Sequence, residues 1–453
     1  MKNIISNNAY FFLLLITVAI ITLIVPGENS DPLPLFSSFT IVFIASIGIV
    51  FRSEMVYSLA KIFNLFTYLF LGIVPIITYK FNISYWGAKA FSSVDYILTN
   101  IVILIALIAF NITYGILTNR RLIDANKNPI TIDISGSPGG RGKALFLVSL
   151  SCAISYYIYY RNGFDVLNVW TRGKLGDTSV LVESSQIEYL IVSYFVTPML
   201  SINLVLYRLW NLRSRLVGSI LLILLILSAP PTSMARFAAA AMYIPILIVY
   251  IPYFSMRNFL SFFIIISLYF VFPTLDKFRQ ELPTSWSDLI NVSDNINMVY
   301  SGHFDAYQSL MMALNEDFVT YGYQLISALL FFIPRAFWPD KGVGSGQEMA
   351  ERYNLTFDNI SATYLAEGYI NFGLLGVLSF VLILAYFCAY MDKRYWVGGR
   401  ATDILGLRTF YFYSLPLLFF VLRGDLMSSF AYFCGFGAAV VLVSVVSRLR
   451  FVF

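Results

Sequence analysis

The stretch LVGSILLILLILSAPPTSMARFAAAAMYIPILIVYIPYF, residues 216–254, decides the fold class. It contains two apolar runs, and a short turn with two prolines and one arginine separates them. A hydrocarbon core about 30 Å thick needs about 20 apolar residues per helix. The two runs carry no charged residue, so they predict a pair of membrane-spanning helices that meet at the turn.

The rest of the chain has the same character. Of its 453 residues, 58% are hydrophobic and only 12% are charged, and the mean hydropathy is +0.75. Soluble domains are about half apolar and about one-quarter charged. The sequence therefore predicts an all-α polytopic membrane protein, with residues 1–453 as a single membrane domain of about twelve transmembrane helices. The predicted spans lie near residues 8–26, 35–51, 62–79, 96–117, 144–161, 187–207, 216–232, 237–254, 258–274, 363–391, 405–422 and 428–447.

Lysine and arginine decide the predicted orientation. With the N-terminus in the cytoplasm, most of the 30 basic residues lie inside and most of the 25 acidic residues lie outside. This distribution agrees with the positive-inside rule, and an even number of spans returns the C-terminus to the cytoplasm. The first span lacks a strong basic region and a small-residue cleavage site, which favours a retained span over a removed signal. The net charge of +5 thus reflects membrane topology, and we expect no nucleic-acid partner.

Two predicted outer loops are longer than a simple connection. The first covers residues 162–186, and the second covers residues 275–362, before the tenth span. Loops longer than about 12–15 residues are usually functional. In the second loop, YQLISALLFFIP (Tyr323–Pro334) is apolar over too few residues to cross, so it predicts a short helix at the outer interface.

Several common signals of chemistry are absent from the sequence. The three cysteines lie inside predicted spans, so no disulfide framework or zinc knuckle is expected. SGSPGGRGK (Ser135–Lys143) resembles a phosphate-binding loop, but its glycine spacing differs and Ala144 stands where Ser or Thr is required. Because there is no DxD pair, HExxH motif or cluster of histidine and cysteine, we expect no metal and no cofactor.

The informative anomaly is cationic. An arginine near the hydrocarbon costs about 2.5–3.5 kcal/mol at a helix centre and less at the edge, so it tends to mark a functional site. Guanidinium groups bind phosphate bidentately and stay ionised, so several converging arginines predict a diphosphate site. The alternative is that they reach lipid headgroups or pair with the outer acidic residues. The arginines that fall outside against the bias are Arg161, Arg172, Arg236, Arg279, Arg335, Arg352 and Arg423.

Three segments carry the strongest of these signals. PPTSMARFAAAA places Arg236 in the first turns of a helix, where an anion is favoured. In IPRAFWPDKG, Arg335 and Lys341 bracket a Pro-Asp pair and are held at fixed spacing by two prolines. RGDLMSS places Arg423 at the outer end of the eleventh span.

Transfer to a hydroxyl group also requires a proton acceptor. ATYLAEGYINFG opens the tenth predicted span, and there Glu367 and Asn371 share a helix face next to Gly368. Glu367 is one candidate base. The structural alternative is that a glutamate stands at the start of this helix only because the helix dipole favours a negative charge there. The only histidine, His303 in YSGHFDAY, is the other candidate, because imidazole titrates near neutral pH.

These motifs resemble the signature of the Wzy-type polysaccharide polymerases, which polymerise O-antigen and other oligosaccharide repeat units. FFIPRAFWPDKG followed by AEGYINFGLLG is similar to their Ile-Pro-Arg-x-x-Trp-Pro-x-Lys pattern and their Ala-Glu-Gly helix entry. PTSMARF and VLRGDLMSSF resemble their arginine turns, and the large late outer loop also fits. The chain departs from the pattern where Lys-Pro is expected, because it has Lys341-Gly342.

The resemblance implies a GT-C-type glycosyltransferase in the bacterial inner membrane, with its active site facing the periplasm. Such an enzyme joins undecaprenyl-diphosphate-linked oligosaccharides into a surface polysaccharide, as in lipopolysaccharide biosynthesis, by inverting transfer without a metal. Its implied partners are the donor and acceptor lipids, the membrane and a chain-length regulator protein.

The resemblance also implies roles for individual residues. The donor diphosphate would be held by Arg236, Arg335, Arg423, Arg279 and Lys341. Glu367 or His303 would take the acceptor proton. The sugars would be contacted by Trp338, Tyr364, Tyr369 and Asn371.

Three other functions stay open. A lipid-linked oligosaccharide flippase or other transporter also binds anionic lipid, but it predicts broken helices at mid-bilayer and charges along a through-path. An O-antigen ligase has the same fold type and a lipid A-core acceptor, and its family relies on a loop histidine, as His303 would supply. A non-catalytic assembly protein is the third alternative.

Overall fold

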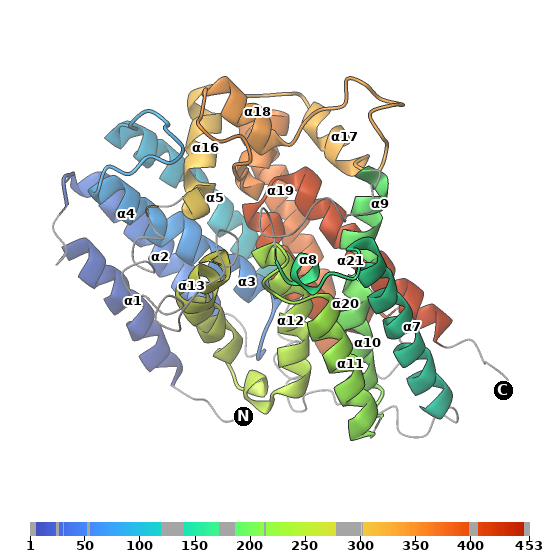
Figure 1. Ribbon diagram of the computed structural model, residues 1–453. Coiled ribbons are helices and arrows are strands. Elements are labelled where there is room, and N and C mark those ends of the chain that lie inside the picture. The colour runs from blue at the N-terminus through green and yellow to red at the C-terminus, as the bar shows by residue number, and fades with distance from the viewer. Residues whose placement is uncertain are drawn as a thin grey trace.

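The computed structural model describes residues 6–23, 27–29, 31–51, 55–118, 140–171, 186–212, 214–277, 300, 302–397 and 406–447. Within these ranges every regular element is a helix (Figure 1). Seven of the helices are long and apolar enough to cross a membrane, which indicates a multi-pass membrane protein. Each predicted span overlaps a helix, but the count of twelve spans stays a prediction.

The helices that satisfy the crossing criteria include two composite runs. The seven are α2 (Pro32–Val50), the run α3 (Leu59–Phe66), η1 (Thr67–Ile73) and α4 (Val74–Lys80), α5 (Ser93–Thr118), α7 (Gly140–Arg161), the run α9 (Gln186–Ile191), η4 (Val192–Val196) and α10 (Pro198–Leu209), α19 (Tyr364–Trp396) and α21 (Leu426–Val446). The other helices of the bundle are α1 (Asn7–Leu23), α8 (Val166–Trp170), α11 (Arg215–Ser228), α12 (Arg236–Tyr250), α13 (Phe259–Lys277) and α20 (Leu407–Arg423).

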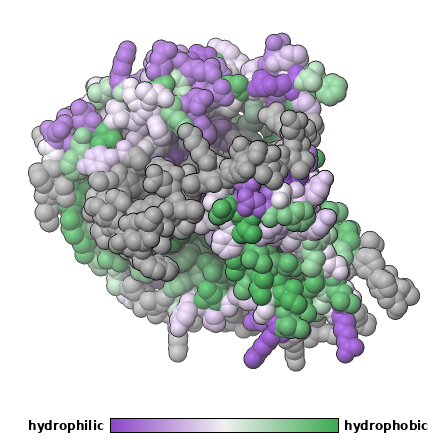
Figure 2. All heavy atoms as spheres, viewed as in Figure 1, coloured by the Kyte–Doolittle hydropathy of each residue, from purple (hydrophilic) through white to green (hydrophobic). Residues whose placement is uncertain are grey.

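Short helices from the long predicted outer loop gather at one end of the bundle. They are η7 (Gly302–Phe304), α16 (Ala306–Asn315), α17 (Tyr323–Leu329) and α18 (Ser345–Arg352), and the last three lie at the top of Figure 1. Figure 2 shows hydrophilic residues concentrated at this end and a hydrophobic belt below it. We call it the predicted outer end, after the charge asymmetry of the sequence.

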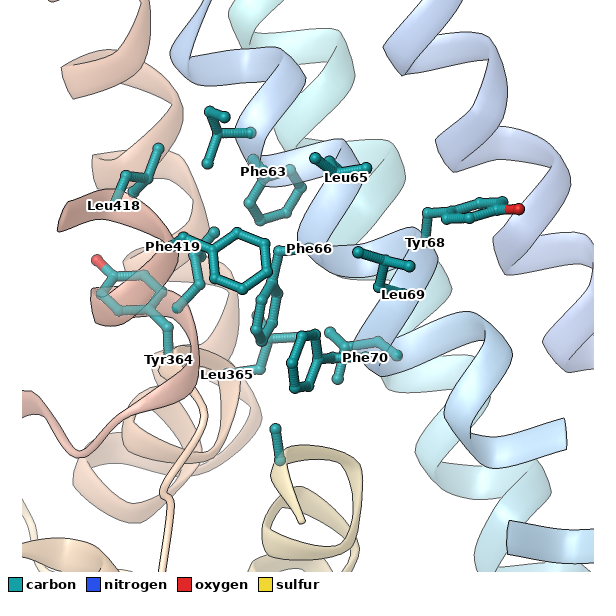
Figure 3. Close-up of a cluster of buried hydrophobic side chains, with 14 of the residues drawn as sticks. Phe63, Leu65, Phe66, Tyr68, Leu69, Phe70, Tyr364, Leu365, Leu418 and Phe419 are labelled. Atoms are coloured by element: carbon teal, nitrogen blue, oxygen red, sulfur yellow. The ribbon is translucent and has the colours of Figure 1, made fainter. Parts of the chain in front are cut away.

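The run α3–η1 forms the centre of the bundle. Figure 3 shows its aromatic residues Phe63, Phe66 and Phe70 packed against Tyr364 and Leu365 at the start of α19 and against Leu418 and Phe419 near the end of α20. Phe66 stacks on Phe70 with ring centroids 5.0 Å apart, and the edges of both rings meet Phe419 of α20 at 5.4 and 5.6 Å. Aromatic rings bury large apolar areas, so this cluster fixes α20 relative to the centre.

A π-helical turn precedes a proline in the run α9–η4–α10. Pro198 has no N–H to donate to the carbonyl four residues earlier, and the helix widens instead, with the N–H of Thr197 bonded to the carbonyl of Val192 at 2.9 Å. A side-chain Cβ at Gly435 would lie 2.4 Å from the carbonyl oxygen of Tyr194. A glycine is therefore required where α21 approaches η4.

α19 is a helical hairpin and not a single straight helix. Phe372 and Gly373 have non-helical backbone angles, and Gly373 has φ of +63°. The hydroxyl of Tyr364 donates to the carbonyl of Phe380 at 3.2 Å, although residues so far apart would be about 24 Å apart along a straight helix. Residues 364–371 therefore fold back against residues 374–396, which span about 34 Å. The sequence prediction of one continuous span missed this reversal.

The close contact between the two arms of α19 depends on glycine. A Cβ at Gly376 would lie 1.9 Å from the carbonyl oxygen of Gly368. The turn itself also needs glycine, because L-residues rarely adopt the positive φ of Gly373.

Candidate functional site

Two of the predicted arginines and the only histidine meet at the predicted outer end. Nη2 of Arg236 lies 2.9 Å from Nε2 of His303. Arg423 donates from Nε to the carbonyl of His303 at 3.1 Å, and from Nη2 to Oδ1 of Asp305, also at 3.1 Å. These residues come from the start of α12, the turn η7 and the end of α20. We call Arg236, His303, Asp305 and Arg423 the arginine–histidine cluster.

The guanidinium of Arg236 lies against the imidazole ring of His303. A guanidinium group only donates hydrogen bonds, so the ring nitrogen is the acceptor in the 2.9 Å contact to Nε2. The same Nη2 lies 3.4 Å from Nδ1 of the ring.

The turn that carries His303 is fixed by its two neighbours. Phe304 is buried and stacks on Phe70 of η1 at 5.2 Å. A Cβ at Gly302 would lie 1.9 Å from the indole of Trp86, so only glycine fits under this ring. The backbone around His303 is thus held from two sides while its own side chain remains half-buried.

Asp305 is the member of the arginine–histidine cluster that the sequence prediction did not include. Its side chain is only 4% exposed, and it accepts hydrogen bonds from the indole Nε1 of Trp86 at 3.1 Å and from the N–H and Oγ of Ser361 at 3.1 and 2.5 Å. Together with Arg423 these donors satisfy a buried carboxylate fully. Its position two residues after the only histidine was the available signal.

The start of α12 adds further positive potential. Ala235 at the N-cap supplies no side-chain acceptor for the first amide groups of the helix, and Arg236 is the first helical residue. A cation at this end opposes the helix dipole, so the arrangement favours an added anion. The guanidinium of Arg423 lies 5.4 Å from the ring of Phe237, which brings it against the same end of α12.

Arg335 and Lys341 have a different environment. Arg335 donates from Nη1 to the carbonyl of Lys341 at 2.5 Å and from Nη2 to the carbonyl of Gly342 at 3.1 Å. Nζ of Lys341 donates to the carbonyls of Phe331 and Ile333 at 2.6 and 3.0 Å. Burial and the neighbouring Arg335 lower the pKa of Lys341. We call residues 331–342 the 331–342 loop, and its two cations bind its own backbone.

Glu367 connects three elements inside the protein. Its side chain is buried, and its two oxygens accept hydrogen bonds from Oγ of Ser345 and from the N–H of Leu426, both at 2.8 Å. Leu426 opens α21, whose N-cap is Asp425. Glu367 therefore caps α21 and ties it to α18 and α19. Its role as a base stays a prediction.

The residues predicted to contact sugars lie outside the cluster contacts. Tyr364 and Tyr369 are buried, and the Tyr369 hydroxyl donates to Asp317 at 2.7 Å. Asn371 is fully buried and accepts from the N–H of Leu325 at 2.7 Å. Trp338 lies in the 331–342 loop, and its ring makes an edge-to-face contact with Tyr323, the first residue of α17.

Of the other arginines predicted to lie on the outer side, two form ion pairs in the structure. Arg161 pairs with Glu188 at 2.5 Å and Arg352 with Glu348 at 3.0 Å, as the ion-pair alternative predicts. Arg172 and the predicted diphosphate ligand Arg279 lie outside the described residues.

A cavity of about 510 Å³ lies elsewhere, between α7 and the run α9–η4. Most of its lining residues are apolar, and the polar side chains of Tyr157 and Glu188 also line it. None of the lining residues belongs to the arginine–histidine cluster. We do not assign it to the same site.

Within the described ranges, no group of three or more His, Cys, Asp or Glu side chains is placed to hold a metal ion. No protein-family model, curated protein or solved structure matches the chain.

Proposed function

We propose that the protein is a membrane glycosyltransferase that polymerises lipid-diphosphate-linked oligosaccharide repeat units. The observation that supports this proposal best is the convergence of Arg236, His303 and Arg423 from three separate segments of a multi-pass membrane protein. Undecaprenyl diphosphate is the carrier that the sequence resemblance implies.

In this proposal Arg236 and Arg423 bind the donor diphosphate. Two guanidinium groups at the start of a helix supply charge and N–H donors for phosphate oxygens. They also stabilise the charge that develops on the leaving diphosphate. Asp305 positions Arg423 for this role through their 3.1 Å ion pair.

His303 is the proton acceptor in this proposal. An arriving diphosphate draws the guanidinium of Arg236 away from Nε2 of His303, and Nε2 then faces the acceptor hydroxyl. The hydroxyl oxygen forms a bond to the anomeric carbon as the bond from that carbon to the diphosphate oxygen breaks. The hydroxyl proton passes to Nε2, and the single displacement inverts the anomeric configuration.

The involvement of His303 also supports a second candidate. A ligase with the same chemistry would transfer the completed chain to a lipid A-core acceptor, and the O-antigen ligase family relies on a loop histidine, as His303 would supply. The two candidates differ in the acceptor and share the donor site.

The transporter alternative predicts a broken helix at mid-bilayer. The break in α19 at Phe372–Gly373 lies instead where α19 meets the predicted outer elements, because the carbonyl of Ile370 binds the N–H of Thr320 just before α17. This position supports a fixed outer site more than a through-path.

Reconstitution into liposomes with lipid-diphosphate-linked repeat units tests the proposal. The wild type is expected to produce polymer, whereas Arg236→Ala and His303→Ala are expected to leave single repeats on the carrier. Arg352→Ala is the matched control, because it removes an arginine that is half exposed and paired with Glu348. Polymer formation by both cluster variants at the wild-type rate would exclude the proposal. Transfer only to a supplied lipid A-core acceptor would identify the ligase, and movement of repeats across the bilayer without new glycosidic bonds would identify a transporter.

A further inference from the structure

α17 has an inverted polarity. Its polar residues Gln324 and Ser327 point into the protein and are 2% and 0% exposed. Of its apolar residues, Ile326 and Leu329 point outward and are 51% and 45% exposed, whereas Leu325 is partly buried and Ala328 is buried. A helix on a water-facing surface shows the opposite arrangement, with its apolar face toward the core. The outer face of α17 is therefore built for apolar surroundings.

Specific hydrogen bonds fix this orientation. Oγ of Ser327 accepts from the N–H of Gly342 at 3.1 Å, and the side-chain amide of Gln324 donates to Glu348. Rotating α17 to hide its apolar face would break both bonds and leave buried polar groups without partners, which is costly. The polar interior and the apolar exterior of α17 thus belong to one arrangement.

α17 is also fastened to the tip of the α19 hairpin. The N–H of Thr320 donates to the carbonyl of Ile370 at 2.6 Å, and the N–H of Gly322 donates to the carbonyl of Asn371 at 2.9 Å. The side-chain oxygen of Asn371 accepts from the N–H of Leu325 at 2.7 Å. These carbonyls are available because α19 breaks at the next residues. The level of α17 along the bundle is therefore set by the hairpin tip.

The hairpin tip lies where the outer boundary of the hydrocarbon is expected. From Trp396 to the tip, the long arm of α19 measures about 34 Å, close to the roughly 30 Å thickness of the bilayer core. Leu374 and Leu375 beside the tip are 61% and 77% exposed, so the apolar surface of this span reaches the level of α17.

The apolar surface continues past the end of α17. Phe332 and Phe337 of the 331–342 loop are largely exposed, and the neighbouring Phe331 meets the edge of Phe430 of the span α21 at 6.2 Å. Large exposed apolar patches mark interaction sites, and this one joins the lipid-facing surfaces of two spans.

We propose that α17 is a membrane-embedded interfacial helix, with Ile326, Leu329 and Phe332 in contact with the acyl chains of the outer leaflet. The inference does not depend on the proposed enzymatic function.

Site-directed fluorescence in liposomes tests this placement. Cys152, Cys388 and Cys434 are replaced by serine or alanine, and Ile326→Cys is labelled with an environment-sensitive dye. The matched control is Glu351→Cys on α18, which is exposed on the polar part of the same outer end. In vesicles of phosphatidylcholine with brominated acyl chains, we expect the label at 326 to lose at least about half of its emission and the label at 351 to remain almost unquenched.

Other outcomes overturn the inference. Emission at 326 that is neither blue-shifted nor quenched would place α17 in water. Blue-shifted emission without quenching by the brominated chains would mean that a second copy or another protein covers it. Leu329→Cys repeats the measurement one turn along, so that a folding defect in one variant does not decide the result.

Discussion

The arginine–histidine cluster and the 331–342 loop both concentrate cations at the predicted outer end, but their partners differ. In the cluster, Arg236 and Arg423 contact groups that are 67 to 120 residues away in sequence, and two of these contacts are to side chains. In the 331–342 loop, Arg335 and Lys341 contact main-chain carbonyls 6 to 10 residues away. The same residue types thus serve tertiary contact in one region and local backbone structure in the other.

The difference has a physical consequence for ligand binding. A phosphate can replace His303 as the partner of Arg236 without opening any backbone turn. It can replace the carbonyls around Arg335 only if the loop gives up the hydrogen bonds that close it, which costs about 0.5–1.5 kcal/mol for each bond of this exposed side chain. Arginine content alone therefore does not identify an anion site, and the partner of each guanidinium must be known.

The largest effect is expected at Asp305. Asp305→Ala removes the acceptor of four donors and leaves Arg423 without its ion-pair partner. Breaking such a buried pair costs about 3–5 kcal/mol, so we expect a clear fall in the unfolding temperature in detergent together with loss of activity. Asp305→Asn is the control, and it should retain part of the stability because an amide oxygen still accepts. Equal stability of the alanine variant and the wild type would contradict the structural role given to Asp305.

Arg236→Ala should separate activity from stability. If Arg236 binds the leaving diphosphate, its loss is expected to lower the rate of polymer formation by a factor on the order of 10²–10³, as for other stabilisers of a developing negative charge. The unfolding temperature should change little, because Arg236 is only half-buried. Single-turnover rates and thermal unfolding of the same preparation measure the two effects. A large loss of stability with an unchanged rate would show that Arg236 has a structural role, as proposed for Arg335, and not a role in diphosphate binding.

Arg335→Ala should show the opposite pattern. It removes two hydrogen bonds that close the 331–342 loop, and because Arg335 is exposed to water we expect about 0.5–1.5 kcal/mol for each bond, or about 1–3 kcal/mol in the free energy of unfolding. The activity per folded molecule should stay near that of the wild type. Arg335→Lys, which can keep one of the two bonds, should recover part of the stability. If a diphosphate analogue bound to the wild type but not to Arg335→Ala, the 331–342 loop would itself be a binding site, contrary to this prediction.

The smallest effect is expected from pH. The pKa of Lys341 is lowered by burial and by Arg335, so the folded state disfavours the charged amine relative to the unfolded state. The cost is fully present below the folded-state pKa and disappears as the pH rises through that pKa toward the unfolded value. Stability measured across this alkaline range should therefore rise slightly more in the wild type than in Lys341→Met. Identical pH dependence of the two proteins would show that the shift has no consequence for folding.

Hydropathy predicted the helices well because a bilayer accepts almost only apolar, internally hydrogen-bonded segments. The short helix in Tyr323–Pro334 was also expected, and α17 is found there. The reversal at Gly373 was missed, because both arms of the hairpin are apolar and a hydropathy window averages over them. The hairpin is revealed by tertiary contacts, such as those between Tyr364 and Phe380 and between Gly368 and Gly376, which a hydropathy window cannot detect.

The sequence named three of the four residues of the arginine–histidine cluster, but it did not show their contacts. Arg236, Arg423 and His303 were each singled out by their position at a predicted span end or in the long loop. The sequence did not show that Arg335 is bound by its own loop, because the path of an irregular loop is not readable from residue types. It did not show that Glu367 caps α21, because that contact joins segments 59 residues apart. Asp305 carried a weak signal, and its importance follows from the donors that Trp86 and Ser361 supply from elsewhere in the chain.

The cap that Glu367 provides to α21 has a bearing on biogenesis. One oxygen of this carboxylate has its donor in Ser345, which the ribosome makes earlier, but the other waits for the N–H of Leu426, which is made much later. Until the last helix has been inserted, the short arm of α19 holds a half-satisfied acid in an apolar interior. The junction of α18, α19 and α21 at the predicted outer end is therefore completed last, and we expect a chain that ends before α21 to remain immature and to be degraded by quality-control proteases.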